Sequence, residues 1–179
     1  NAGRLALWYP RAGLGLPLFA ESQTGMLHPL NLALFSTFPA RRGDAFAIVI
    51  ECFLGGLFAY AFARSIGTSL SGGLLTASAF MFSGFFAAQE GQLWSRSAGM
   101  HLPLILLCAE RLAGRGRWGY LFWSALAIAV ALLAGHYQLQ FQSILAFAVY
   151  VSWRRVQRVG LRRAVADGRT YLMLLAPLL

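Results

Sequence analysis

The sequence predicts an all-α polytopic membrane protein, and three observations support this prediction. Apolar residues make up 58% of the 179 residues, Asp, Glu, Lys and Arg together only 12%, and the mean hydropathy is +0.60. A soluble globular chain is about 45–50% apolar and about 25% charged, so this chain has too little charge to cover a water-facing surface. The apolar residues also come in successive runs, most of them long enough for a membrane helix, separated by short breaks.

The net charge of +9 raises the alternative of a nucleic-acid-binding protein. All fifteen basic residues are Arg, however, and they occur in short clusters between the apolar runs. Such clusters are typical of the loops between membrane helices, whereas a nucleic-acid-binding protein would have a continuous basic face. We therefore expect membrane lipids, and not nucleic acid, as partners of the basic residues.

Neither end of the chain has the pattern of a natural terminus. The chain begins at Asn1 without a signal-peptide pattern and stops at Leu179 inside an apolar run, so we expect an internal piece of a longer polytopic protein.

Cys52 and Cys108 both lie in apolar segments. We expect them to be small buried hydrophobic side chains and not a disulfide or a metal pair.

Residues 1–44 are predicted to form an extracytoplasmic first loop, because charged residues are scattered there among Pro, Gly and aromatic residues. Within this loop, the segment from Pro29 to Phe38 predicts a short amphipathic helix. Pro29 suits a first helical turn and Pro39 ends the helix. Its apolar stripe consists of Leu30, Leu34 and Phe38.

Residues 45–179 are predicted to form a transmembrane helix bundle. The expected spans cover about 45–63, 69–88, 98–112, 118–135 and 138–153, followed by a truncated span at 170–179. The third span is short and contains Pro103, which predicts a tilted, kinked or re-entrant segment.

The distribution of Arg predicts the orientation of this bundle. Arg64 and the two clusters at 111–117 and 154–169 fall on one side, which carries ten Arg against five on the other. The positive-inside rule assigns the side with ten Arg to the cytoplasm. The loops 1–44 and 89–97 then face outward, together with most residues capable of acid–base or phosphate chemistry.

Two acids lie near the start of the first span. Asp44 is a good N-cap for a helix that begins at residue 45, a role worth about 1 kcal/mol. Glu51 lies inside the span, where a carboxylate is expensive and is a functional candidate by default. The sequence leaves open whether Glu51 is protonated or bonded to a neighbouring helix.

Three stretches resemble the bacterial YfhO-type membrane proteins. WYPRAGLGLPLFAESQTGMLHPLNLALF is similar to that family's first outer loop, with its W-x-P, G-x-P-L, acid, Q-x-G and Y/H-P-x-N-L elements. FMFSGFFAAQEGQLWSRSAGMHLPLILLCAERL shares an F-S-G-F element and a later L-P-L-I-L-L. LLAGHYQLQFQS resembles the family's G-H-x-Q turn. Together the three stretches cover most of the chain.

This resemblance implies a fold like that of the GT-C membrane glycosyltransferases and a place in the bacterial inner (cell) membrane. Such enzymes take a sugar from a polyprenyl-phosphate carrier at the outer leaflet and pass it to a hydroxyl or amide acceptor, here a cell-envelope polymer or lipid. An acid of the first outer loop generally lies at the reaction centre. The matching position here is Glu21, where relatives more often have Asp.

The chemistry of sugar transfer assigns roles to the outer residues. Glu21 is the expected catalytic base, and Arg96 is the expected cation for the departing phosphate, because a guanidinium holds two oxygens at once. His101 and His136 are alternative phosphate donors, although His136 at the start of a turn equally suits a helix cap. His28, before a proline, is expected to be structural.

Glu90 completes the candidate site. It is expected either to bind substrate or to pair with Arg96 in the same loop. Glu90 and Asp44 could also hold a divalent cation with Glu21 through oxygen ligands, so the sequence leaves the cofactor open.

Two other functions remain open beside sugar transfer. A transporter or flippase of a lipid-linked substrate predicts ionisable residues or helix breaks near the membrane midplane in paired helices. A non-catalytic membrane scaffold needs none of the outer acids.

Overall fold

The computed structural model describes residues 7–10, 13–18, 20–115 and 118–161, together with 168 and 171. Within this part of the chain every secondary-structure element is a helix, which confirms the predicted all-α class. The exception is a single antiparallel bridge between Tyr9 and Leu16. The predicted span at 170–179, apart from residue 171, lies outside the described residues.

Within the described residues, nine helical elements follow one another. They are η1 (Ser22–Thr24), α1 (Pro29–Thr37), α2 (Ala40–Ser65), α3 (Leu70–Met81), α4 (Gly84–Ala88), α5 (Leu93–Gly99), α6 (Leu102–Arg115), α7 (Trp118–Leu132) and α8 (Tyr137–Val159).

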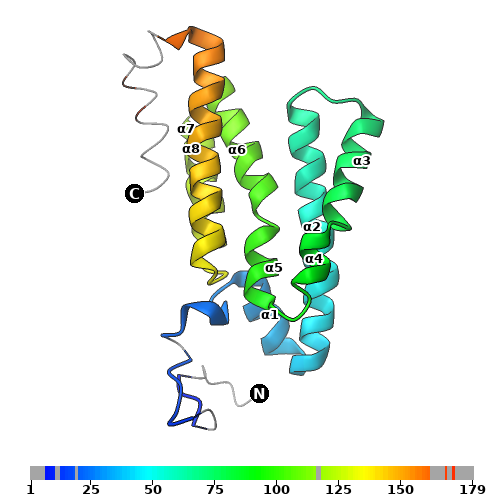
Figure 1. Cartoon of the computed structure of the whole chain (residues 1–179), viewed down its shortest axis with the longest axis vertical. Helices are drawn as coiled ribbons and strands as arrows, with labels where there is room; N and C mark the ends of the chain where they lie inside the picture. Colours follow the sequence, from blue (N-terminus) through cyan, green and yellow to red (C-terminus); the bar gives the residue numbers. More distant parts are fainter. Residues whose placement is uncertain are drawn as a thin grey trace.

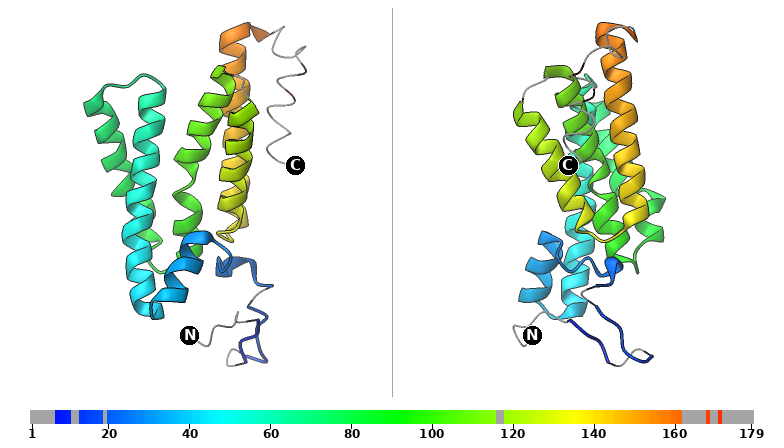
Figure 2. Two further views of the ribbon diagram at one scale, coloured as in Figure 1. Left: turned by 180° about the vertical axis from the view of Figure 1, so that it is seen from behind. Right: turned by 90° about the vertical axis from the view of Figure 1, so that its left-hand side faces the viewer.

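The long helices run up and down between two ends of one bundle (Figure 1). From the lower end α2 rises, α3 and α4 return beside it, α5 and α6 rise, α7 descends and α8 rises again (Figures 1 and 2). We call the lower end, where α1 and the N-terminal segment lie, the loop end. We call the opposite end, where α2, α6 and α8 terminate, the basic end.

The start of α2 differs from the prediction. Pro39 is its N-cap and the helix begins at Ala40, so Asp44 lies within the first turns and does not cap a helix at residue 45. The N-cap prediction for Asp44 is therefore wrong. The predicted helix before Pro39 is present as α1, which begins at Pro29 and ends at Thr37.

Two helix breaks interrupt the expected spans. The second span is divided at Phe82 and Ser83, between α3 and α4. The predicted outer loop at 89–97 is partly helical, because α5 occupies its second half and turns into α6 at Met100 and His101. This break lies within the third expected span, for which the sequence predicts a tilted, kinked or re-entrant segment.

Two segments are long and apolar enough to cross a bilayer, α2 with 26 residues and the 19 residues Leu70–Ala88. The surface of the bundle is also apolar, with exposed stripes at i, i+4 and i+8 on α2 and α8. These stripes consist of Val49, Phe53 and Leu57 on α2, and of Phe141, Leu145 and Val149 on α8.

The interior of the bundle is made of small, apolar and polar side chains. The face of α2 that is buried contains Ala47, Glu51, Gly55, Ala59 and Ala63. A cluster of larger apolar residues packs between α6, α7 and α8, where Ile105, Phe147 and Val151 are almost fully buried. Several buried polar side chains, among them Glu51 and Arg96, lie close to the loop end.

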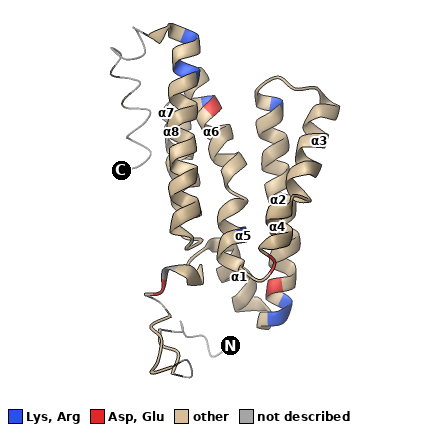
Figure 3. Ribbon diagram, in the orientation of Figure 1, with Lys and Arg blue, Asp and Glu red and all other residues tan. Residues whose placement is uncertain are grey.

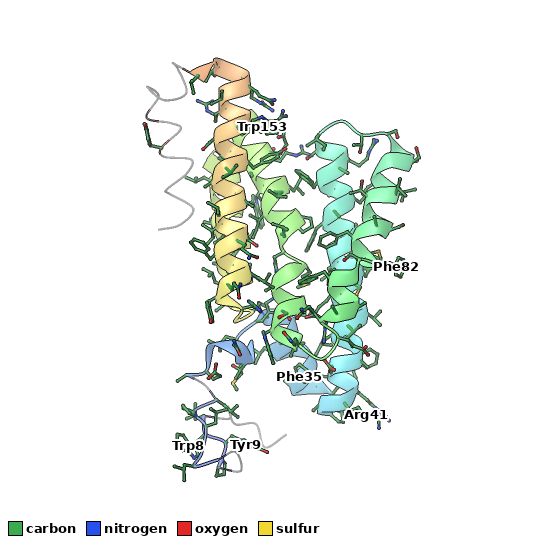
Figure 4. The ribbon with its side chains drawn as sticks, viewed as in Figure 1. Trp8, Tyr9, Phe35, Arg41, Phe82 and Trp153 are labelled. Carbon is green, nitrogen blue, oxygen red and sulfur yellow. The ribbon has the colours of Figure 1, made fainter. Side chains whose placement is uncertain are left out.

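Charged residues gather at the two ends of the bundle (Figure 3). Arg64 lies in the last turn of α2 and Arg158 in the last turn of α8, both at the basic end. Arg41 lies at the loop end, far from Trp153 near the end of α8 (Figure 4). This arrangement agrees with the two sides on which the sequence placed these Arg residues, while their cytoplasmic location stays a prediction.

Candidate functional site

The guanidinium of Arg96 lies at the centre of a buried polar site near the loop end. Its Nε donates to Oε2 of Glu51 at 3.1 Å, and its Nη2 donates to Oδ1 of Asp44 at 2.6 Å. Its Nη1 donates to the backbone oxygens of Gln89 and Glu90. Every nitrogen of the guanidinium is therefore engaged, and the side chain is only 1% exposed.

Ser97 extends this site towards the first loop. Its hydroxyl donates to Oε1 of Glu51, so both oxygens of that fully buried carboxylate accept a hydrogen bond. The amide of Asn31 donates to Oγ of Ser97 at 3.3 Å and to the backbone oxygen of Gly25 at 3.1 Å. We call Asn31, Asp44, Glu51, Arg96 and Ser97 the polar cluster; it joins α1, α2 and α5.

Small residues let these elements approach one another. At Gly99, in α5, an added Cβ would lie 2.3 Å from the ring of Phe85 in α4. At Gly55, in α2, it would lie 2.9 Å from the ring of Phe80 in α3. α5 also packs against α2, where Arg96 reaches two acids that lie seven residues, or about two turns, apart along the helix.

Two histidines lie beside the polar cluster. The rings of His28 and His101 meet edge to face with centroids 5.2 Å apart, and Nδ1 of His101 lies 2.7 Å from the backbone oxygen of Ser97. Neither ring nitrogen of the buried His28 has a hydrogen-bond partner in the described structure. Burial, and then the neighbouring His101, lower the pKa of His28 to about 4, so its ring is neutral at pH 7.

Glu21 lies in different surroundings from Arg96. It is the N-cap of η1, half-buried, with Oε1 accepting from the backbone N–H of Gln23 at 3.5 Å. Glu21 also lines a cavity of about 240 Å³ between the first loop and the turn that joins α7 to α8, opposite Leu132 and Tyr137. The Glu21 carboxylate is therefore partly buried at the edge of this cavity.

Gly25 connects the Glu21 cavity to the polar cluster. It lines the cavity, and its carbonyl accepts the amide hydrogen of Asn31. Its backbone has φ of +57°, a conformation that favours glycine, and an added Cβ would lie 2.8 Å from the backbone oxygen of Ala134. The Glu21 cavity and the polar cluster are therefore adjacent, and Gly25 contacts both.

The predicted site residues are thus only partly brought together. His136 is the N-cap of α8, with Nδ1 accepting from Leu139 N–H at 3.2 Å, so the capping alternative is confirmed. Glu90 is exposed and meets Arg96 through its carbonyl, not through its carboxylate. No group of three or more His, Cys, Asp or Glu within the described residues could hold a metal ion, so the cation alternative gains no support.

Glu110 is a residue that the sequence reasoning missed. At the basic end it accepts from Arg154 Nε at 2.6 Å, from Arg158 Nη2 at 3.2 Å and from the hydroxyl of Tyr150 at 2.9 Å. The available signal was an acid at the end of an apolar run on the side that the Arg clusters define. This site joins α6 to α8 and lies at the other end of the bundle from Glu21.

The comparisons with known proteins add no family to this description. The chain matches no family model, no curated protein and no solved structure. The resemblance to the YfhO-type proteins therefore stays a prediction that depends on its three sequence stretches.

Proposed function

We propose that this chain is part of a multi-pass membrane glycosyltransferase that transfers a sugar from a polyprenyl-phosphate carrier to a cell-envelope acceptor, with Glu21 as the base. The observation that carries this proposal is the position of Glu21, half-buried on the wall of a cavity whose other walls are mostly apolar. The motif resemblance independently selects the same residue.

The apolar exterior and the separation of charges support a membrane location. A water-soluble bundle would bury large apolar residues and expose polar ones, but here Phe53 and Leu145 are exposed while Glu51 and Arg96 are buried. With the basic end in the cytoplasm, the Glu21 cavity lies at the outer surface, where a lipid-linked sugar donor is presented.

The residues around the cavity supply parts of the proposed chemistry. The Glu21 carboxylate would take the proton from the acceptor hydroxyl or amide as the bond from the sugar to the carrier phosphate breaks. The hydroxyl of Tyr137, which lines the cavity, would donate to the departing phosphate. His136 precedes Tyr137 in the chain, and its Nε2–H would be a second donor, because its Nδ1 accepts from Leu139. Arg96 is a positioning residue in this proposal, because its donors are already bound within the polar cluster.

Replacement of Glu21 tests the proposal directly. In the full-length protein, Glu21→Gln should lower transfer from a lipid-linked sugar donor by about 10²–10⁴-fold, the usual contribution of a general base. The matched control is Glu90→Gln, which removes an exposed acid at the same end of the bundle. Equal transfer by wild type and Glu21→Gln would remove the proposed base.

Transport of a lipid-linked substrate is the second candidate, and the helix breaks favour it. The α3–α4 and α5–α6 segments are both interrupted, and α4 and α5 pack together through Phe85 and Gly99 beside the helix that carries Glu51. Interrupted helices next to buried charges are typical of transporter binding sites. In vesicles, a transporter would retain flux in Glu21→Gln, whereas transferase activity would be lost in that variant.

A further inference from the structure

A second cavity lies between α2, α6 and α7, away from both Glu21 and Arg96. It has a volume of about 580 Å³, and its walls are almost entirely apolar. Phe58 and Ala61 of α2 form one side, Leu104 of α6 and Trp123 of α7 form others, and His101 and Arg111 lie along α6. We call this cavity the α6 cleft.

The α6 cleft occupies the half of the bundle that ends at the basic end. From His101 to Arg111 is ten residues, or about 15 Å at about 1.5 Å per helical residue. The hydrocarbon core of a bilayer is about 30 Å thick, so the cleft has the depth of one leaflet. Its α2 residues, Phe58 and Ala61, likewise belong to the second half of that helix.

Arg111 differs from the other basic side chains described around it. Arg154 and Arg158 both pair with Glu110, and Nη1 of Arg64 donates to the backbone oxygen of Thr68. Arg111 is half-buried, and within the described part of the chain it makes no hydrogen bond or ion pair. A half-buried guanidinium without an acid partner is suited to an anion from outside the chain.

We propose that the α6 cleft binds one acyl chain of an anionic phospholipid from the leaflet at the basic end, with the lipid phosphate on Arg111. The depth of the cleft, its apolar walls and the Arg111 guanidinium, which has no partner among the described residues, all match such a lipid. This proposal rests on the membrane placement under Proposed function and is independent of sugar transfer.

Lipid retention by the purified full chain tests this site. Native mass spectrometry after extraction and addition of phosphatidylglycerol or phosphatidylcholine should show preferential retention of phosphatidylglycerol. Arg111→Gln should lower that preference about fivefold, as expected for one Arg at a membrane surface. Ala61→Phe, which places a ring in the cleft, should lower the binding of both lipids.

Two control variants separate the cleft from general effects of charge and bulk. Arg64→Gln removes another cation of the basic end, and Ala79→Phe adds a ring on an exposed face of α3; both should bind lipid as the wild type does. Glu21→Gln should also retain lipid, so loss of transfer activity and loss of lipid are distinguishable.

Three results would overturn the proposal. Equal retention of the two lipids by the wild type would show that no headgroup is selected. An unchanged preference in Arg111→Gln would remove the phosphate contact. Chemical cross-links from Cys108, which lines the cleft, to a segment of the same chain other than α2, α6 and α7 would show that protein and not lipid fills the space.

Discussion

Glu110 and Arg154 form a two-point ion pair between α6 and α8. Nε of Arg154 donates to Oε2 at 2.6 Å and Nη2 donates to Oε1 at 2.5 Å, so the planar guanidinium faces the planar carboxylate. The carboxylate is 6% exposed and the guanidinium side chain 24%. The pair holds together the ends of two helices that otherwise meet through apolar side chains.

Loss of this carboxylate should loosen the basic end. We expect Glu110→Gln to lower the free energy of unfolding by about 2 kcal/mol, because it weakens charge-assisted bonds to Arg154 and leaves Arg158 without its ion pair. Thermal unfolding in detergent micelles measures the change. Tyr150→Phe, which removes one hydroxyl bond to the same carboxylate, should have about half that effect. Equal stability of wild type and Glu110→Gln would contradict the structural role.

The Arg96–Glu51 pair should show strong coupling. Arg96→Gln leaves the buried Glu51 carboxylate without its cation, and we expect it to destabilise the protein by about 3–5 kcal/mol. Glu51→Gln should destabilise it less, because Arg96 keeps its ion pair with Asp44. The double variant should be less destabilised than the sum of the two, since it buries neither charge. Asp44→Asn is the control, with a smaller effect because the Asp44 side chain is 46% exposed. Additive single effects would rule out the coupling.

His28 should make stability depend on pH. Its pKa is about 4 in the folded protein against 6.5 unfolded, so below pH 6.5 the unfolded state binds a proton that the folded state does not. Stability should fall as the pH drops from 6.5 towards 4, by at most about 3 kcal/mol at about 1.4 kcal/mol per pKa unit. Unfolding of wild type and His28→Phe at pH 7.5 and pH 5 measures this contribution. Parallel losses in the two proteins would assign the pH dependence to other groups.

Gly25 should tolerate substitution poorly. Gly25→Ala combines a positive φ with a Cβ 2.8 Å from the Ala134 carbonyl, so we expect about 2 kcal/mol of destabilisation and a widened Glu21 cavity. Gly13→Ala is a matched control, because Gly13 has φ of +56° and no atom within 4 Å of an added Cβ. Limited proteolysis of the first loop should therefore accelerate more in Gly25→Ala than in Gly13→Ala. Equal rates would show that contact with Ala134 has no part in holding the loop.

Local sequence signals predicted much of the helical layout. Pro29 and Pro39 marked the limits of α1, and the position of His136 in its turn indicated a cap for α8. The N-cap prediction for Asp44 failed because α2 begins earlier, after Pro39, and because Arg96 uses the Asp44 carboxylate.

Local sequence signals did not predict the polar cluster. Glu51 and Arg96 are 45 residues apart, and Ser97 and Asn31 are 66 apart, so only the packing of α1, α2 and α5 brings them together. The sequence singled out Glu51 as unusual without naming its partner, and it placed Arg96 on the outer surface. Burial of a cation depends on acids supplied by another helix, which hydropathy and spacing along one segment do not report.

The buried face of α2 has a further consequence for the register of the bundle. Alanine and glycine occupy nearly every position of that face, which lets neighbouring helices approach closely. Glu51 is the one long side chain among these buried positions, and it fits only where Arg96 and Ser97 meet it. A shift of α2 by one helical turn would move the carboxylate about 5.4 Å along the helix axis, away from both donors. The ion pair thus favours one alignment of α2 with α5.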